Sequence, residues 1–196
     1  GLMVANRGLP EVEVVQTDEG AEIGLTLLRC VGWLSRDDLS TRKNHAGPFL
    51  PTPAAQMQGK WEFDYSIIPH AGSWDSDNDQ FIPFQQAHHF ITPLRAIETN
   101  IHPGSEINTG SYIHLFPCSF TISCIKETMD KIGWLYRGYN LSDQEITVSL
   151  SSWKKFQTAW LGNLAEKTIT RLKPEKSGIY TFQAGPHKII SICFYQ

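Results

Sequence analysis

The chain has 196 residues, a hydrophobic fraction of 41% and a formal net charge of −3. This length suffices for one large domain or two small ones that bury a core without disulfides or metals. A weakly acidic chain without lysine or arginine runs is not typical of proteins that bind nucleic acid or membrane surfaces, so we expect neither partner.

Two features of the sequence bear on cellular compartment. No signal-peptide pattern and no apolar run of about 20 residues is present, so we expect a soluble, cytoplasmic protein. The chain enters an apolar run at its second residue, which favours a segment of a longer protein. Four cysteines lie in or beside apolar runs without C-x-x-C spacing, and are predicted to be buried free thiols: Cys30, Cys118, Cys124 and Cys193.

Strand patterns dominate the first third of the chain. Residues 11–15 (EVEVV) alternate between polar and apolar, and residues 21–34 form a long, mostly apolar run, as expected of a strand covered on both faces. Residues 60–70 alternate again. One side of this last strand is predicted to carry Trp61, Phe63, Tyr65 and Ile67.

The middle of the chain, residues 71–110, is irregular in pattern and carries prolines that exclude a central strand. A short helix is predicted at residues 85–94. We therefore expect two domains, residues 1–109 and residues 110–196.

The last part of the chain predicts eight short strands, with turn residues about every ten positions. This cadence is typical of an antiparallel β-sandwich, so the fold class is predicted to be all-β. Asn140 begins an N-x-S sequence between two strands, which we interpret as turn chemistry and not as a glycan site. The eight segments are SYIHLFP, SFTISCIKE, IGWLYRGYN, QEITVSL, KFQTAWL, EKTITRL, GIYTFQ and HKIISICFY.

The chain shows no pattern of an autonomous enzyme or metal site. It lacks a phosphate-binding glycine loop, a G-x-S-x-G elbow and an H-E-x-x-H pair. His88 and His89 are adjacent, so their side chains diverge and cannot share an ion. The acidic run at residues 75–79 lacks the glycine that a calcium loop needs. We expect no catalytic residue and no metal in this chain.

A charged stretch follows the apolar run at residues 21–34. Both signs are mixed at the exit of this run, which favours a loop ordered by charge-assisted hydrogen bonds; the residues are Arg29, Arg36, Asp37, Asp38 and Arg42. Adjacent aspartates are a poor match for the two carboxylates of a glycosidase, which face each other across a bond. The loop either faces a polar partner, such as another domain or a sugar, or is a solvated surface.

Five blocks of the sequence resemble the C-terminal region of glycoside hydrolase family 38 α-mannosidases, closest to the bacterial group that includes mannosylglycerate hydrolases. The resemblance covers nearly the whole chain. It includes a pattern of lysine, acidic turn, arginine-bearing strand and asparagine near the end. The blocks are VANRGLPEVEV, LTLLRCVGWLSRDDLSTRKNHAGP, TPAAQMQGKWEFDYSIIPHAGSW, FTISCIKETMDKIGWLYRGYNLSDQEITVSL and HKIISICFYQ.

The resemblance implies a fold and a role. Residues 1–109 would be part of a galactose-mutarotase-like supersandwich, and residues 110–196 a small terminal β-sandwich. The zinc ion, the nucleophile and the acid/base group of this retaining hydrolysis of α-mannosides belong to a separate N-terminal barrel. The chain would pack on that barrel and shape the mannoside site. The implied substrate-rim candidates are Arg42, Arg36, Asp38, Asp37, Arg7 and Asn6.

Two other functions stay open on the sequence alone. The six tryptophans are compatible with a free-standing carbohydrate-binding module. Only two of them, Trp74 and Trp153, are predicted to lie in loops. A homo-oligomerising scaffold is the other alternative, if a large apolar face is exposed. The remaining tryptophans fall in strand-like runs and are predicted to be core residues: Trp33, Trp61, Trp134 and Trp160.

Overall fold

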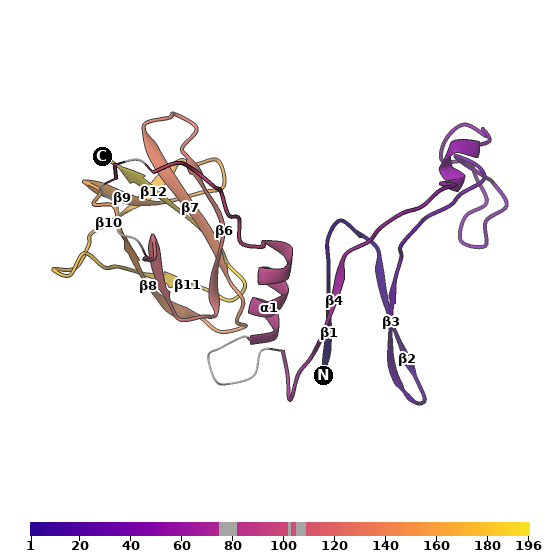
Figure 1. Ribbon diagram of the computed structural model, residues 1–196, viewed down its shortest axis with the longest axis horizontal. Helices are drawn as coiled ribbons and strands as arrows, with labels where there is room; N and C mark the ends of the chain where they lie inside the picture. The colour runs from indigo at the N-terminus through magenta and orange to yellow at the C-terminus, as the bar shows by residue number, and fades with distance from the viewer. Residues whose placement is uncertain (75–81, 102, 105–108) are drawn as a thin grey trace. The chain divides into compact units, whose positions relative to one another are not determined.

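The structure is a computed structural model that describes residues 1–74, 82–101, 103–104 and 109–196 (Figure 1). The acidic run at residues 75–79 and His102 lie outside these residues. Strands predominate and every sheet is antiparallel, so the predicted all-β class is confirmed. In the described part of the chain, no helix is both long enough and apolar enough to span a membrane.

The chain divides into two compact units. The ribbon unit consists of Leu2–Pro69 and Gln86–Leu94, and the sandwich unit consists of Gly1, His70–Gln85 and Arg95–Gln196. The predicted division at residue 110 stays a prediction. Helix α1 (Ile82–Ile91) spans the boundary between the two units, and it confirms the short helix predicted in this region.

The sandwich unit contains all eight strands that its sequence pattern predicted (Figure 1). They form a five-stranded sheet in the order β10-β9-β12-β7-β6 and a three-stranded sheet in the order β11-β8-β5. The strands are β5 (Ile113–Phe116), β6 (Phe120–Glu127), β7 (Gly133–Asn140), β8 (Ile146–Ser152), β9 (Thr158–Gly162), β10 (Thr168–Leu172), β11 (Tyr180–Ala184) and β12 (Ile189–Tyr195).

The core of the sandwich unit draws side chains from both sheets. Val148 and Leu150 of β8 are fully buried with Phe194 of β12. The Phe194 ring lies 4.9 Å from the ring of Tyr136 and 5.2 Å from that of Tyr180, measured between centroids. Alternation within each strand places these residues on the inner faces, where burial of a large side chain contributes roughly 1.5 to 3 kcal/mol.

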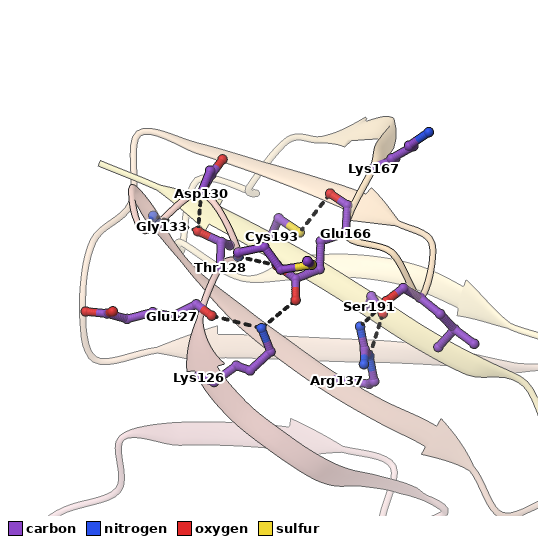
Figure 2. Close-up of polar contacts among 12 residues, drawn as sticks. Lys126, Glu127, Thr128, Asp130, Gly133, Arg137, Glu166, Lys167, Ser191 and Cys193 are labelled. Carbon is purple, nitrogen blue, oxygen red and sulfur yellow. Dashed lines mark hydrogen bonds and ion pairs between the residues drawn. The ribbon is translucent and has the colours of Figure 1, made fainter.

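A polar network covers the outer face of the five-stranded sheet (Figure 2). The Glu166 carboxylate, in the turn between β9 and β10, accepts hydrogen bonds from Lys126 Nζ at 2.5 Å and from the Met129 backbone N–H at 2.6 Å. Only 7% of the Glu166 side chain is exposed, against 41% for Lys126. These bonds tie the turn between β6 and β7 to the turn between β9 and β10.

Arg137 of β7 extends the same network. Its Nε donates to Ser191 Oγ at 2.9 Å, and its Nη2 donates to the Leu164 backbone carbonyl at 3.0 Å (Figure 2). Ser191 and Cys193 of β12 are buried. The central strand β12 is therefore covered on both faces, by the apolar core on one side and by the polar network on the other.

Asn140 organises the turn that follows β7. The side chain is 1% exposed, and its amide donates to the backbone carbonyls of Gln144, Ala184 and Gly185 at 2.7 to 3.1 Å. Its carbonyl accepts from the Ser142 N–H at 2.8 Å. The turn interpretation of this N-x-S sequence is confirmed.

The ribbon unit contains two two-stranded sheets. Strand β1 (Leu2–Asn6) pairs with β4 (Tyr65–Pro69), and β2 (Val12–Thr17) pairs with β3 (Gly20–Leu25). The 3₁₀-helix η1 (Pro53–Gln56) lies in the long loop between β3 and β4.

Two strand predictions in this unit were wrong in extent. The run at residues 21–34 is a strand only to Leu25, because the returning segment at residues 50–56 bonds the chain at isolated points and forms no ladder. The predicted strand at residues 60–70 begins only at Tyr65. Its predicted apolar side is exposed: 52% for Tyr65 and 57% for Ile67, whereas Ile68 is 7% exposed.

The prediction of four buried thiols was also wrong. Cys193 is buried and Cys124 is half-buried, but Cys30 and Cys118 are exposed. Cys30 lies in the irregular part of the mispredicted strand, and Cys118 lies in the turn between β5 and β6. Neither position has a sheet above it, so an apolar neighbourhood in the sequence did not produce burial.

Replacing Asn140 should destabilise the sandwich. In Asn140→Ala the three carbonyls lose their donor, and we expect the free energy of unfolding to fall by about 2 to 4 kcal/mol in urea titrations of the isolated chain. Asp143→Ala, in the same turn but exposed, is the control and should change stability by less than about 0.5 kcal/mol. Equal stability of Asn140→Ala and the native chain would contradict this role.

The Lys126–Glu166 pair should make stability depend on pH. The pKa of Glu166 lies below its ordinary value of 4.5, first because of the hydrogen bond from Lys126. A carboxyl whose pKa is lowered by folding stabilises the fold above its unfolded pKa, and this stabilisation is lost as the pH falls through the folded pKa.

Glu166→Gln should therefore unfold at a lower urea concentration than the native chain at pH 7. The difference should shrink as the pH falls below 4.5, the ordinary pKa of this group. Glu145→Gln, which removes an exposed carboxylate, is the matched control and should show no such pH-dependent difference. A difference of the same size at pH 7 and pH 3 would exclude the ion pair as its cause.

Candidate functional site

The charged stretch predicted from the sequence lies in the loop between β3 and β4. Backbone hydrogen bonds close its base: the Leu34 N–H donates to the Leu50 carbonyl at 2.9 Å, and the Thr52 N–H donates to the Gly32 carbonyl at 2.9 Å. An isolated antiparallel bridge joins Trp33 to Pro51. The intervening residues form a closed loop, which we call the arginine loop (residues 33–51).

Ser35 fixes the interior of the arginine loop. Its hydroxyl oxygen accepts hydrogen bonds from the backbone N–H groups of Ala46 and Gly47, at 3.0 and 3.2 Å. Ser35 is 6% exposed, which makes it the most buried residue of the loop. These bonds fold Ala46 and Gly47, which follow the charged stretch, back onto Ser35, which directly precedes it.

Aromatic side chains line one part of the arginine loop. Trp33 and Phe49 stack with ring centroids 4.4 Å apart and an interplanar angle of 16°. The His45 ring meets the Phe49 ring edge-on at 5.4 Å. Trp33 is 37% and Phe49 54% exposed, so the stack presents ring surface to solvent.

The prediction that four tryptophans are core residues was wrong. Trp33 and Trp61 lie in the loop between β3 and β4, where no second layer covers them, and Trp61 is 48% exposed. Trp160 lies opposite Cys193, on the outer face of β9, and is half-buried. Trp134 lies opposite Phe194, on the inward side of β7, but close to the start of the strand, where it is 37% exposed. An alternating pattern in the sequence predicts a strand, but it does not show which of its side chains are buried until the pairing of the strand is known.

Arg36 and Asp38 form a fork-to-carboxylate pair. Arg36 Nε donates to Asp38 Oδ1 at 2.7 Å, and Arg36 Nη2 donates to Asp38 Oδ2. The hydrogen bond from Arg36 lowers the pKa of Asp38. The Asp37 carboxylate lies 3.6 Å from His45 Nε2. Arg36, Asp37 and Asp38 are thus engaged with one another or with His45, in agreement with the prediction of a loop ordered by charge-assisted bonds.

Arg42 differs from the other arginines of this region. It is half-buried and lines an open groove of about 770 Å³ together with Trp33, Arg36 and Leu39. Arg29 lines the same groove but pairs with Glu11 at 2.8 Å. Within residues 1–74, 82–101, 103–104 and 109–196, Arg42 has no hydrogen-bond or ion-pair partner. Its guanidinium is available to a ligand.

Asn6 and Arg7, the second-choice candidates, lie outside this groove. The Asn6 side-chain carbonyl accepts from the Leu9 N–H at 2.9 Å, and Gly8 has a φ of +76°. Arg7 donates from Nε to the Phe90 carbonyl at 2.9 Å and stacks over the Phe90 ring at 4.3 Å. The structure gives both residues intramolecular partners; their contact with substrate stays a prediction.

The groove has the properties of a binding surface. An arginine fork can bond a carboxylate or a pair of hydroxyls, and exposed aromatic faces contact apolar faces of a ligand. The described residues contain no group of three or more His, Cys, Asp and Glu side chains that could hold a metal. The polar network of Figure 2 is closed by internal bonds, whereas this groove is open.

Sequence reasoning identified the arginines of the groove, Arg29, Arg36 and Arg42, but missed its aromatic part. Trp33 was assigned to a strand core, and Phe49 was given no role. The signal that could have found them is the pair of prolines at positions 48 and 51, which turn the chain back toward Trp33.

Comparison with known proteins assigns the fold. Residues 119–192 match a family described as "Glycosyl hydrolases family 38 C-terminal beta sandwich domain". A putative mannosylglycerate hydrolase from Halalkalibacterium halodurans is 25% identical over 194 residues, which cover 99% of this chain and 19% of the relative. The crystal structure of an alpha-mannosidase from Enterococcus faecalis V583 superimposes with a TM-score of 0.71 at 24% identity, covering 100% of this chain and 19% of that one.

The chain thus spans about a fifth of the length of the proteins it matches: 19% in each case. The fold of the sandwich unit, the family match and the near-complete coverage of this chain agree with one another. The predicted resemblance to the C-terminal region of family 38 glycoside hydrolases is therefore confirmed, with residues 119–192 corresponding to its terminal β-sandwich domain.

Proposed function

We propose that this chain is the accessory C-terminal region of a retaining α-mannosidase, which packs on a zinc-dependent catalytic barrel and uses the arginine loop to shape the mannoside site. The observation that carries the proposal is Arg42, a half-buried residue whose guanidinium has no partner among the described residues, at the wall of an open groove. A guanidinium without an internal partner can bond a ligand or another surface without first giving up a bond inside the fold.

The chemistry of the groove suits a mannoside. Vicinal hydroxyls of a sugar ring match the planar donor fork of Arg42, and the exposed Trp33 ring offers a surface for the apolar face of a pyranose. The relative from H. halodurans is named for a substrate, mannosylglycerate, whose aglycone carries a carboxylate. A carboxylate is the preferred partner of an uncommitted arginine.

The ribbon unit supports the packing part of the proposal. A two-stranded sheet alone is marginally stable in water, yet this unit has two of them. Val12 and Val14 lie two residues apart on one face of β2 and are 61% and 64% exposed; Leu2 and Ile67 are 51% and 57% exposed. Such exposed apolar faces are typical of surfaces covered by a partner, here the barrel of the same protein.

The chemical roles would be divided between this chain and the barrel. The nucleophile, the acid/base carboxylate and zinc would belong to the barrel, where zinc would orient the mannose hydroxyls. The residues of this chain would position the substrate: Arg42 would bond its aglycone or hydroxyls, and the Arg36–Asp38 pair would hold the loop that carries Arg42.

Arg42→Ala tests the groove in the intact enzyme. We expect kcat/KM for mannosylglycerate to fall by about one to three orders of magnitude, because a charge-assisted bond to the substrate is lost. The loss should be smaller for p-nitrophenyl α-mannoside, which has no carboxylate. Lys43→Ala, a neighbouring exposed cation outside the groove, is the control. Native kinetics of Arg42→Ala on both substrates, with native folding, would remove Arg42 from the site.

Val14→Lys tests the packing surface. In the intact enzyme the melting temperature and the activity should both fall, the activity by about tenfold or more, because a buried apolar contact would become a buried charge. The isolated 196-residue chain should keep its own stability with this substitution, and should not hydrolyse p-nitrophenyl α-mannoside even with added zinc. Glu13→Lys, on the other face of β2, is the matched control. An intact Val14→Lys enzyme with native stability and activity would contradict packing through this face.

A further inference from the structure

The outward face of the three-stranded sheet in the sandwich unit has an unusual composition. Strands β5 and β8 pair so that Phe116 lies opposite Ser149 and His114 opposite Ser151, while β11 places Thr181 opposite Ser149. The alternate positions, such as Leu150 and Phe182, face the core. We call the outward set the aromatic face: Tyr112, His114, Phe116, Thr147, Ser149, Ser151, Trp153, Thr181 and Gln183.

Three large aromatic rings of this face are exposed. Tyr112 and Phe116 are each 63% exposed, and Trp153 is 54% exposed. The Trp153 N–H donates to the Tyr112 carbonyl at 3.0 Å, so the ladder continues one step beyond the ends of β5 and β8. The two rings meet edge-on with centroids 5.1 Å apart. Both residues are therefore held by backbone pairing at the end of the sheet. Their rings are exposed although they do not belong to a free loop.

The rings are spread along one line. Tyr112, His114 and Phe116 succeed one another at every second position, so the line extends over roughly 14 Å at about 3.4 Å per residue. All three side chains are exposed. A line of this length is suited to a ligand of several rings and exceeds what a single pyranose would cover.

The rest of the aromatic face is polar but uncharged. Besides the three aromatic rings, it presents four hydroxyl groups, one amide and the His114 imidazole, and none of its nine residues is Asp, Glu, Lys or Arg. Thr147 and Gln183 bond each other across the strands at about 3.0 Å. The Thr181 hydroxyl donates to Glu175, at the margin of the face. In the part of the chain that the structure describes, the Ser149 and Ser151 hydroxyls have no partner.

We propose that the aromatic face is a binding site for a neutral oligosaccharide. Sugar rings have apolar faces that stack on aromatic side chains and equatorial hydroxyls that bond short hydroxyls and amides; this face offers both on one rigid surface. A protein partner is less well matched: protein interfaces are enriched in methionine and arginine as well as in aromatic residues and are depleted in serine, whereas this face has no methionine or arginine and has Ser149 and Ser151 at its centre. A polyanion is disfavoured because no cation lies on it.

This site is separate from the function proposed above. The arginine loop belongs to the ribbon unit and carries charged groups, whereas the aromatic face belongs to the sandwich unit and is neutral. The aromatic face would hold a glycan without acting on it. Failure of either proposal would leave the other unaffected.

Calorimetric titration of the 196-residue chain tests the aromatic face. The probes are linear α-1,6-mannotetraose and cellotetraose as neutral sugars, with tetragalacturonate as an anionic comparator. We expect saturable binding of at least one neutral probe and weaker binding of the anion. Trp153→Ala and Phe116→Ala should each weaken that binding by about tenfold or more, as expected for the loss of an aromatic anchor.

Two further variants test whether the sugar binds at the aromatic face itself. Trp134→Ala removes a tryptophan of the five-stranded sheet, 37% exposed and not part of the aromatic face, and should bind as the native chain does. Ser151→Glu places a charge on the aromatic face without removing a ring and should abolish binding; it provides the test if the alanine variants do not fold. Circular dichroism and urea titration establish folding for each variant.

Three outcomes would overturn the proposal. The first is the absence of binding of both neutral probes at millimolar concentration. The second is binding that survives Trp153→Ala, Phe116→Ala and Ser151→Glu, or that is lost equally in Trp134→Ala. The third is self-association of the chain that Trp153→Ala abolishes in the absence of sugar binding, which would assign the face to a second copy of the chain.

Discussion

Charge pairing in and beside the arginine loop is the constraint on which the proposed role of Arg42 depends. Arg36 is held by Asp38, Asp37 by His45, and Arg29 by Glu11, so each of these charges has a partner at short range. Exposed pairs of this kind contribute only about 0 to 1 kcal/mol each, which is too little to hold the fold. Their effect is geometric: with Arg29 and Arg36, the other arginines of the groove, engaged, Arg42 is left there without a partner among the described residues. The Ser35 hydroxyl and the bridge at its base give this irregular loop a fixed shape, which lets a loop act as a binding surface.

The two units show how far sequence patterns reach. All eight strands of the sandwich unit were predicted, because period-two alternation and turn residues are local signals and the two sheets supply the layers that such strands need. The same reasoning failed for residues 26–34, where an apolar run exists without a neighbouring strand to pair with. Apolar composition signals a strand only if the chain offers a partner at the right distance. The exposed faces of the ribbon unit also lack a partner. Side chains such as Val14 and Ile67 lie in an alternating apolar pattern that is typical of buried strand faces, but nothing in the described chain covers them.

The site residues divide along similar lines. Arg36, Asp37, Asp38 and Arg42 could be selected from the sequence because charges crowd into a few positions after an apolar run. That Arg42 alone among them lacks a partner could not be predicted, because pairing depends on distances of a few ångströms set by loop closure. The sandwich network illustrates the opposite case. Lys126, Arg137 and Asn140 follow the resemblance pattern of lysine, arginine and asparagine, and each is fully engaged inside the fold. A conspicuous charged residue is therefore not by itself a functional one.

This contrast gives a physical criterion for separating structural from binding groups in such accessory domains. Glu166, Arg137 and Asn140 stabilise the fold because their bonds are satisfied internally, so a ligand would have to break those bonds before it could make new ones. Arg42 and the rings of Tyr112, Phe116 and Trp153 have surface that the protein leaves open, so a ligand gains contacts without that cost. The open groups differ in character: the groove combines a cation with aromatic rings and suits a sugar with an anionic substituent, whereas the aromatic face is uncharged and suits a neutral one. The two proposed sites therefore call for ligands of different charge, and each can be tested with a ligand that the other should not bind.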